Sequence, residues 1–542
     1  MEALIIYNMV GGTLGEGHKH DCGIPQGCPL SMMLIAFLLR PWIMIMDKMD
    51  VIPRILADDI LIMAIGNEHE KRFKAAYEAT HVFLQDIGAL MAPTKSTTFS
   101  TVRTTRAKLR THIWETTKTL IKVVIHARDL GSHLNTTANM CSPTLNHRIR
   151  EAIEIVNKIG WTGFSMDIKA MLIRTKAIAK ALYGVEASPY NRQTMQSLRV
   201  AIANVIAIKS RLRSIDLAFA TAMLGNDLDP EIVVFVRRAL LLRRMLVKHP
   251  ELTETVKNIW SIYNSHKHKA TFYSPEDLNE KMPGLIDDDD KEEKDDKAMG
   301  PIGLLLDSIR NLGAGMCPDF LIHQKYEPAV SLMETPWQHL RPITEDIAFR
   351  ARFKCTVQKR TFLKSCGKTA EIDRETFNDA TKNRTNEEKR MLSSITNFGR
   401  WSDSKINSFD PENDGACWLC QAPMGDTTHI LWDCCELREA RIDGDLDFDG
   451  IKWQNLPPML LMGLPPAMRA DDSYSFWDGT DCVQTQQLPE CMRLPRTWKM
   501  EQAARDLISS RNLYTSKLNA RQFIAYHKVQ GIKEDYPMPF FA

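Results

Sequence analysis

The sequence predicts an α+β fold, with a mixed N-terminal domain, a long helical region and a small zinc-binding segment in the C-terminal third. Three observations support this prediction. Residues 1–135 alternate short β-like runs with helical patterns, residues 146–213 show helical periodicity, and a compact group of Cys and His lies at 417–434. The length of 542 residues suits three or four domains rather than one.

The composition argues against several classes of protein. No basic segment followed by an apolar stretch and a small-residue cleavage site begins the chain, so we expect no signal peptide. The 12 cysteines lack the spacing of a small disulfide framework, which indicates a reducing compartment, the nucleus or the cytoplasm. The apolar run at 30–46 is interrupted by Arg40 and Pro41 and falls short of the roughly 20 residues of a membrane span. We therefore expect a buried helix there and no membrane partner.

A loop rich in Gly and Pro, residues 23–31, precedes this helix. Gly27 lets the backbone approach a nucleotide closely because it has no Cβ, and Pro29 stiffens the loop. Gln26 can hydrogen-bond a nucleotide or the template backbone, and Ser31 can cap the helix that follows. We predict that these four residues bind nucleotide or template. An ordinary Gly/Pro loop is the alternative.

Apolar residues flank Asp58 and Asp59 on both sides within 55–65, a pattern that predicts two short strands joined by a tight turn. Adjacent carboxylates on a turn can bind Mg²⁺, which prefers oxygen ligands together with substrate phosphates. In two-metal phosphoryl transfer, one ion activates a hydroxyl and the other neutralises the leaving pyrophosphate. Taken alone, the Ala-Asp-Asp tripeptide is more often a simple polar turn. Here Asp58 follows Ser31 by 27 residues, with an apolar helix between them.

Helical patterns continue beyond this hairpin. The spacing of apolar residues predicts a helix over 68–87 with Gly88 as its C-terminal cap. Residues 146–213 carry 12 Lys and Arg against 4 Asp and Glu. Within them, four cations at helical spacing predict one face that neutralises phosphates without reading sequence: Lys169, Arg174, Lys176 and Lys180. A solvated helix surface is the alternative.

The pattern C-x₂-C-x₈-H-x₄-C predicts a tetrahedral zinc site, because four soft or borderline ligands lie within 18 residues. Its ligands are Cys417, Cys420, His429 and Cys434. Cys435 is an alternative to the last ligand, and a set of buried reduced cysteines is the alternative to a metal site. We expect a structural role for the ion. Three neighbours are expected to contact nucleic acid: Trp418, Arg438 and Arg441.

Residues 23–31 and 56–59 together resemble the reverse transcriptase palm of non-LTR (LINE-type) retrotransposons. The resemblance continues in order through 92–97, through Leu130-Gly131 and through 182–186. It implies that Asp58 and Asp59 are catalytic magnesium ligands and that Lys95 lies near the leaving pyrophosphate. It also implies that Leu130-Gly131 belongs to the primer-grip hairpin and that 182–186 belongs to the thumb. The Cys/His pattern after the thumb is similar to one that these elements carry.

The resemblance implies an RNA-directed DNA polymerase whose partners are an RNA template, a DNA primer and deoxynucleotides, with Mg²⁺ as cofactor and Zn²⁺ as structural ion. The first metal-binding aspartate of the family lies tens of residues before the Gln-Gly loop, whereas Asp21 abuts that loop. We therefore expect a chain that lacks its N-terminal portion, the fingers and the first palm aspartate. Such a chain would be weakly active or inactive alone, since its metal site lacks a carboxylate.

Six segments follow from these patterns: 1–135, a partial palm; 136–250, a helical basic thumb; 251–300, an acidic linker around the charged run 287–297; 301–410, a helical connection; 411–440, the zinc segment; and 441–542, a tail of unknown fold. Two other interpretations stay open. One is a non-catalytic nucleic-acid-binding remnant that uses only the thumb and zinc segment. The other is an organellar intron maturase, which the Cys/His pattern and the Leu-Tyr-Gly segment disfavour.

Overall fold

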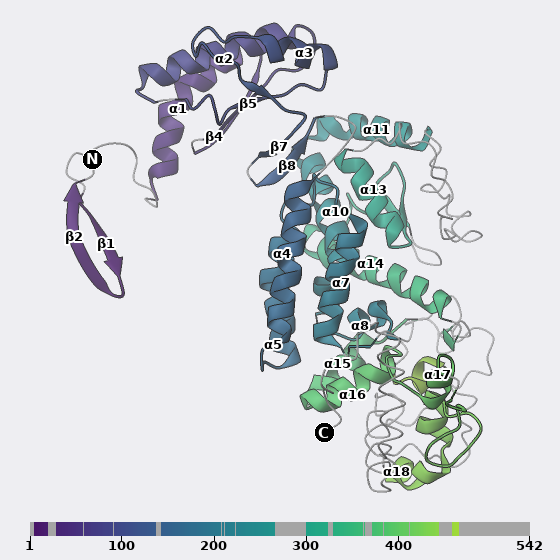
Figure 1. Ribbon diagram of the computed structural model, residues 1–542. Helices are drawn as coiled ribbons and strands as arrows, with labels where there is room; N and C mark the ends of the chain where they lie inside the picture. The colour runs from purple at the N-terminus through teal and green to yellow at the C-terminus, as the bar shows by residue number, and fades with distance from the viewer. Residues whose placement is uncertain are drawn as a thin grey trace. The chain divides into compact units, whose positions relative to one another are not determined.

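The computed structural model contains both helices and small sheets, as an α+β fold requires (Figure 1). It describes residues 5–19, 29–57, 59–89, 91–129, 131–136, 142–207, 209–210, 212–222, 224–265, 300–323, 329–360, 362–363, 371–382, 384–410, 412–443 and 458–464. The chain divides into two compact units, Met1–Ala127 and Arg128–Ala542. No helix in the described part is both long and apolar enough to cross a bilayer.

The first unit contains short hairpins between amphipathic helices. Its elements are β1 (Ile5–Val10), β2 (Thr13–Lys19), α1 (Ser31–Lys48), β3 (Ile52–Leu56), β4 (Asp59–Met63), α2 (His69–Asp86), β5 (Thr97–Thr98), α3 (Arg103–Thr111) and β6 (Lys122–Val123). Strands β1 and β2 form one antiparallel hairpin, β3 and β4 form a second, and β5 pairs with β6 in parallel.

The β3–β4 hairpin confirms the two short strands predicted around the paired aspartates. Leu56 pairs with Asp59. Ala57, which follows Leu56, has a φ of 55°, which is uncommon for a residue with a Cβ and fits a tight hairpin turn. The predicted helix at 68–87 is also confirmed, as α2 (Figure 1), and Gly88 follows it with a φ of 76°.

Helix α1 forms where the apolar run predicted it, but the expectation that it is buried is wrong. Only Leu39, Trp42 and Met46 are buried, and the indole nitrogen of Trp42 donates a hydrogen bond of 2.8 Å to Thr80 on α2. Strand β3 and helix α2 contact one side of α1. Leu34, Ile35 and Ile45 are half-buried, and most of the other apolar side chains of the run, such as Phe37, are exposed.

The first large element group of the second unit is a helical bundle, which a short hairpin precedes. Strand β7 (His126–Asp129), which spans the boundary between the units, and β8 (Ser132–Asn135) form a hairpin before it. The bundle contains α4 (Pro143–Gly160), α5 (Met166–Leu172), the π-helical turn η1 (Ile173–Ile178), α6 (Ala179–Ala181), α7 (Arg192–Ile206), α8 (Ile215–Ala220), α9 (Gly225–Leu228) and α10 (Pro230–Lys248). Helices α4 and α7 lie side by side (Figure 1), and α4 also contacts the continuous stretch α5–η1–α6. Their apolar faces make one core.

A second, larger core joins the end of this bundle to the rest of the unit. The further elements are η2 (Pro250–Leu252), α11 (Thr253–Ser265), α13 (Pro301–Asn311), β9 (Gly315–Met316), β10 (Leu321–His323), β11 (Val330–Ser331), α14 (Trp337–Lys359), α15 (Arg374–Lys382), α16 (Asn386–Thr396), α17 (Asp403–Asn407), η4 (His429–Asp433), η5 (Cys435–Leu437), α18 (Arg438–Asp443) and α19 (Pro458–Leu461).

Two features of this region differ from the segments predicted by sequence. The linker expected from residue 251 does not begin there, since α11 is helical and buries Val256 and Trp260, one turn apart, in the larger core. The charged run at 287–297 lies outside the described residues. The segment expected to be a helical connection also contains the small antiparallel sheet β9–β10–β11.

Candidate metal centre and nucleic-acid interface

The Cys/His segment folds as a tight knuckle followed by a π-helical turn. The backbone N–H of Cys417 donates to the carbonyl of Ala422, and the N–H of Gln421 donates back to the carbonyl of Cys417, both at 2.8 Å. Gln421 has a φ of 61°, as such a sharp reversal requires. A Cβ on Gly425 would lie 2.9 Å from the Cα of Cys417, so only glycine fits against the knuckle.

The second half of the segment supplies the other two ligands. The carboxylate of Asp426 accepts the backbone N–H of His429 at 2.6 Å and so caps the turn η4. The turn closes at Cys434, whose N–H donates to the carbonyl of His429 at 2.7 Å. Neighbouring Cys435 is exposed whereas Cys434 is fully buried, so the structure selects Cys434 from the two alternatives.

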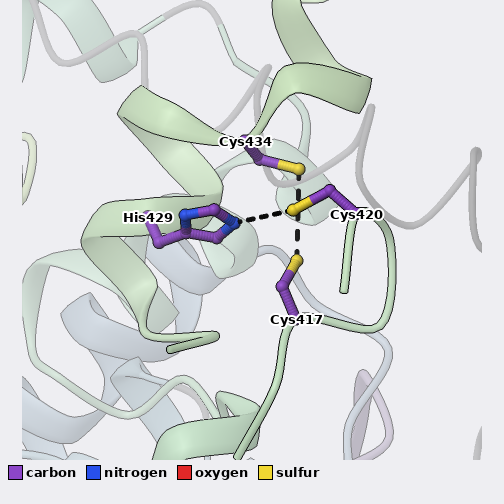
Figure 2. Close-up of side chains that lie close together, drawn as sticks. All are labelled: Cys417, Cys420, His429 and Cys434. Atoms are coloured by element: carbon purple, nitrogen blue, oxygen red, sulfur yellow. Dashed lines mark hydrogen bonds between the residues drawn. The ribbon is translucent and has the colours of Figure 1, made fainter. Parts of the chain in front are cut away.

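The four predicted ligand side chains point toward one another (Figure 2), and their ligand atoms all lie within 4.8 Å of one another. The Sγ atoms of Cys417 and Cys434 are 4.0 Å apart, and Nε2 of His429 is 3.2 Å from Sγ of Cys420. Zn–S bonds of about 2.3 Å in a tetrahedron place two sulfurs about 3.8 Å apart. The residues therefore fit a metal ion such as zinc.

The electrostatics of the centre favour a cation. A hydrogen bond from Cys434 lowers the pKa of Cys417 to about 4, and the same hydrogen bond raises the pKa of Cys434. The hydrogen bond thus favours the thiolate form of Cys417, which is the form of cysteine that binds metal. The carboxylate of Asp433 lies 3.6 Å from Nδ1 of His429, on the ring nitrogen that faces away from the sulfurs. Such a carboxylate orients a metal-binding imidazole.

Asp426 and Asp433 are not among the predicted site residues, although the position of each relative to His429 is typical of its role. Asp426 stands three residues before His429, as a cap does, and Asp433 stands four residues after it, one helical turn away. Of the residues expected to contact nucleic acid, Arg438 is exposed and Trp418 is half-buried. Arg441 is buried, which differs from the expectation that it contacts nucleic acid.

The residues expected at the polymerase site are only partly described. Asp59 is exposed at the start of β4, whereas Asp58, Gln26 and Gly27 lie outside the described residues. Pro29 is exposed, and Lys95 is exposed in a turn after α2. Ser31 is the first residue of α1 and not its cap, because Leu30 occupies the cap position and no side-chain cap hydrogen bond forms there. Within the described part of the chain, no group of three metal-ligating side chains forms at the hairpin turn. The described residues therefore offer a magnesium ion one carboxylate, that of Asp59.

The predicted primer-grip and thumb segments lie against each other. Leu130 lies outside the described residues, but Gly131 has a φ of 81° at the β7–β8 turn. The guanidinium of Arg148 on α4 donates to the carbonyl of Gly131 at 2.5 Å and to that of Tyr183 at 3.1 Å. It also lies 5.0 Å from the centre of the Tyr183 ring. A Cβ on Gly184 would lie 2.8 Å from the hydroxyl of Ser132 on β8, so the contact is close.

The four cations predicted to line one helical face do not do so. Arg174, Lys176 and Lys180 are exposed, and Arg174 and Lys180 pair with Asp227 and Glu151 at 3.1 and 3.2 Å. The fourth cation, Lys169, is buried, and its Nζ donates to the carbonyl of residue 160 at 2.9 Å. The physical reason is that the C-terminal carbonyls of α4 need donors, and Lys169 lies beside them. The π-helical turn η1 also shifts the spacing of the face.

No family model matches the sequence, and no curated protein matches it either.

Proposed function

We propose that this chain is a nucleic-acid-binding protein of the LINE-type reverse transcriptase lineage, with RNA-directed DNA polymerisation as the chemistry associated with its palm residues. The observation that carries the proposal is the β3–β4 hairpin between α1 and α2, in which Leu56 pairs with Asp59 and Asp59 is exposed. Helix, hairpin with paired acids and helix follow one another in the order that the resemblance implies.

Magnesium bound by such carboxylates supplies charge neutralisation for phosphoryl transfer. Asp58 and Asp59 would hold it, and Lys95 would add a positive charge for the leaving pyrophosphate. The remaining residues of the proposed site would position the strands rather than react. In the second unit, taken by itself, Arg148 donates to the carbonyls of both Gly131 and Tyr183, and the resemblance implies that Gly131 belongs to a primer-grip hairpin.

The helical bundle supports nucleic-acid binding independently of catalysis. Its exposed cations, such as Lys176, lie on helices whose opposite faces are packed into an ordered core. Cations held on a rigid scaffold bind phosphates with little loss of freedom, and the affinity then falls as salt rises. The Cys/His centre would act structurally, by holding the end of the larger core together around Cys417 and Cys434.

A second candidate is a nucleic-acid-binding protein without polymerase activity. It is favoured by one specific observation: the four ligand atoms of the Cys/His centre lie within 4.8 Å of one another, and the bundle has a buried core of its own. Under this candidate the zinc-loaded chain binds RNA and the hairpin acids are dispensable.

Primer extension on an RNA template with Mg²⁺ separates the two candidates. The parent chain is compared with the double variant Asp58→Ala/Asp59→Ala, and the affinity of both for the same template is measured by fluorescence anisotropy. Under the proposal, any extension requires Mg²⁺ and is lost in the double variant, while RNA affinity is kept. Extension that survives in the double variant contradicts the role of the hairpin. Equal RNA binding without extension in either protein favours the second candidate.

A further inference from the structure

Trp161 is the most exposed large apolar side chain that the structure describes, at 92% of its surface. It lies at the C-terminal end of α4, where its N–H still donates to the carbonyls of Asn157 and Lys158. Other exposed apolar side chains follow on the turn and on the first part of α5: Phe164, Ile168 and Met171. Several exposed apolar side chains within one short stretch, with an aromatic residue among them, are typical of an interaction surface.

The turn that carries Trp161 is held by hydrogen bonds on both sides. Lys169, from α5, donates to the carbonyl of Gly160, the residue before Trp161, at 2.9 Å. The hydroxyl of Thr162 donates to the carbonyl of Ile159 at 2.7 Å, and Ser165 caps α5. The indole is therefore presented on ordered backbone, so a ligand that stacks on it does not have to order the turn first.

Positive charge leads along α4 to this indole. Arg150 and Lys158 are exposed and lie eleven and three residues before Trp161, on the same side of the helix. Neither makes an ion pair with a described residue, and Glu154 is the one exposed acid between them along this side. On the neighbouring stretch, exposed Lys176 adds a third cation that has no ion-pair partner in the described part of the chain.

We propose that Trp161 is a stacking platform for a base of single-stranded nucleic acid, and that Arg150 and Lys158 bind the phosphates that lead to it. An aromatic ring stacks on any base through its π-face, and cations beside it bind the backbone, a combination that recognises single strands without regard to sequence. A base paired within a duplex is already stacked and cannot reach an isolated indole. The inference rests on the proposed nucleic-acid binding and adds the class of ligand and the residue that recognises it.

The test measures the affinity of the full chain for two labelled 20-mers by fluorescence anisotropy, oligothymidine and an abasic strand with the same number of phosphates. Trp161→Ala should weaken binding of oligothymidine between about 5-fold and 150-fold, the range found when one base–aromatic stack is removed. The same variant should bind the abasic strand as the parent does. Trp161→Phe, which keeps a ring, should stay within a few-fold of the parent on both strands.

Trp337 provides a matched control, because it is also an exposed tryptophan of the same unit, at 51%. Trp337→Ala should leave both affinities unchanged, and the melting temperature of each variant checks that the fold is kept. Equal affinity of Trp161→Ala and the parent for oligothymidine contradicts the platform while leaving nucleic-acid binding intact. So does an equal loss on the two strands, which is the result expected of damage to the turn. No binding of either strand by the parent contradicts this inference and the proposed function together.

Discussion

The sulfur atoms of Cys417 and Cys434 lie 4.0 Å apart although 17 residues separate them, whereas Cys435, the next residue, is exposed. The separation is too long for a disulfide, whose S–S bond is about 2.05 Å. It is close to the spacing of two sulfurs on one tetrahedral zinc ion. The sulfur–sulfur distance and the burial of Cys434 therefore favour Cys434 over Cys435 as the fourth ligand, a choice that the sequence leaves open.

Metal content should follow that distinction. The purified chain should contain one zinc ion per molecule, and Cys434→Ser should lose it because a serine hydroxyl is a poor zinc ligand. Cys435→Ser is the matched control and should retain the full ion. Atomic emission of the dialysed proteins measures both. A Cys434→Ser variant that still binds one ion, with an empty Cys435→Ser variant, would reverse the assignment.

Removing zinc should destabilise the larger core and not only the knuckle. Cys417 and Cys434 are members of that core, together with side chains of α10 and α14. The indole nitrogen of Trp432, two residues before Cys434, donates a hydrogen bond of 2.9 Å to the carbonyl of Leu461. A strong chelator should therefore lower the melting temperature measured by circular dichroism. In a unit that spans Arg128–Ala542, each kcal/mol of lost stability lowers it by about 1 °C, since the unfolding entropy is about 2.1 cal/mol/K per residue. An unchanged melting temperature after the ion has been removed would contradict this coupling.

A buried charge cluster should be a large contributor to the stability of the second unit. Arg199 donates to both oxygens of Asp229, at 3.0 and 2.8 Å, and to Asp216 at 2.6 Å. Burial alone would raise the pKa of Asp216, but the charge of Arg199 and then that of Arg352 lower it. Arg199→Met leaves buried carboxylates with less compensation, so unfolding in urea should show a loss of about 3–5 kcal/mol.

Arg341 offers the control for this measurement. It pairs with Asp227 and Glu345 at 3.1 and 2.7 Å, but its own side chain is 55% exposed. Solvent screens such a pair, so Arg341→Met should cost less than about 1 kcal/mol. Similar losses in Arg199→Met and Arg341→Met would mean that burial does not set the strength of these pairs.

Lys405 should make the stability depend on pH above neutrality. Burial, with the nearby charges of Arg360 and Arg400, lowers the pKa of Lys405 to about 8, although its ammonium donates to the carbonyl of Phe398. Between about pH 8 and the ordinary lysine pKa of about 10.4, the unfolded chain binds more protons than the folded one. Stability should therefore rise with pH across this window, by up to about 1.4 kcal/mol per pH unit. Lys405→Met should remove this rise in urea unfolding measured from pH 7.5 to 10. Parallel curves for the two proteins would contradict the shift.

Local patterns in the sequence were sufficient for elements whose geometry is set by neighbouring residues. The β3–β4 hairpin follows from apolar runs around two acids, and α2 follows from helical spacing ended by Gly88. The grouping of Cys417, Cys420 and His429 follows from ligand spacing alone. In each case the residues that decide the geometry lie within about twenty positions of one another.

Features that depend on distant partners could not be predicted in this way. Which side of α1 is exposed depends on the elements that pack against the helix, and an apolar run does not specify those elements. Lys169 is buried because the end of α4 lies beside it, a tertiary contact. Strands β9, β10 and β11 have two or three residues each, too few to show an alternating pattern. Helix α11 is different. The spacing of Val256 and Trp260, one helical turn apart, is a local pattern that predicts a buried helical face.

The most direct test of the central claim is the affinity of the zinc-loaded chain for a labelled RNA at increasing salt. A nucleic-acid-binding protein that uses exposed cations such as Lys158 and Lys176 releases counterions, so the logarithm of its affinity should fall linearly with the logarithm of salt concentration. A slope of about −2 to −4 would correspond to a few neutralised phosphates on a single strand, at about 0.7 for each. No measurable binding at low salt, or an affinity that does not change with salt, would contradict the account.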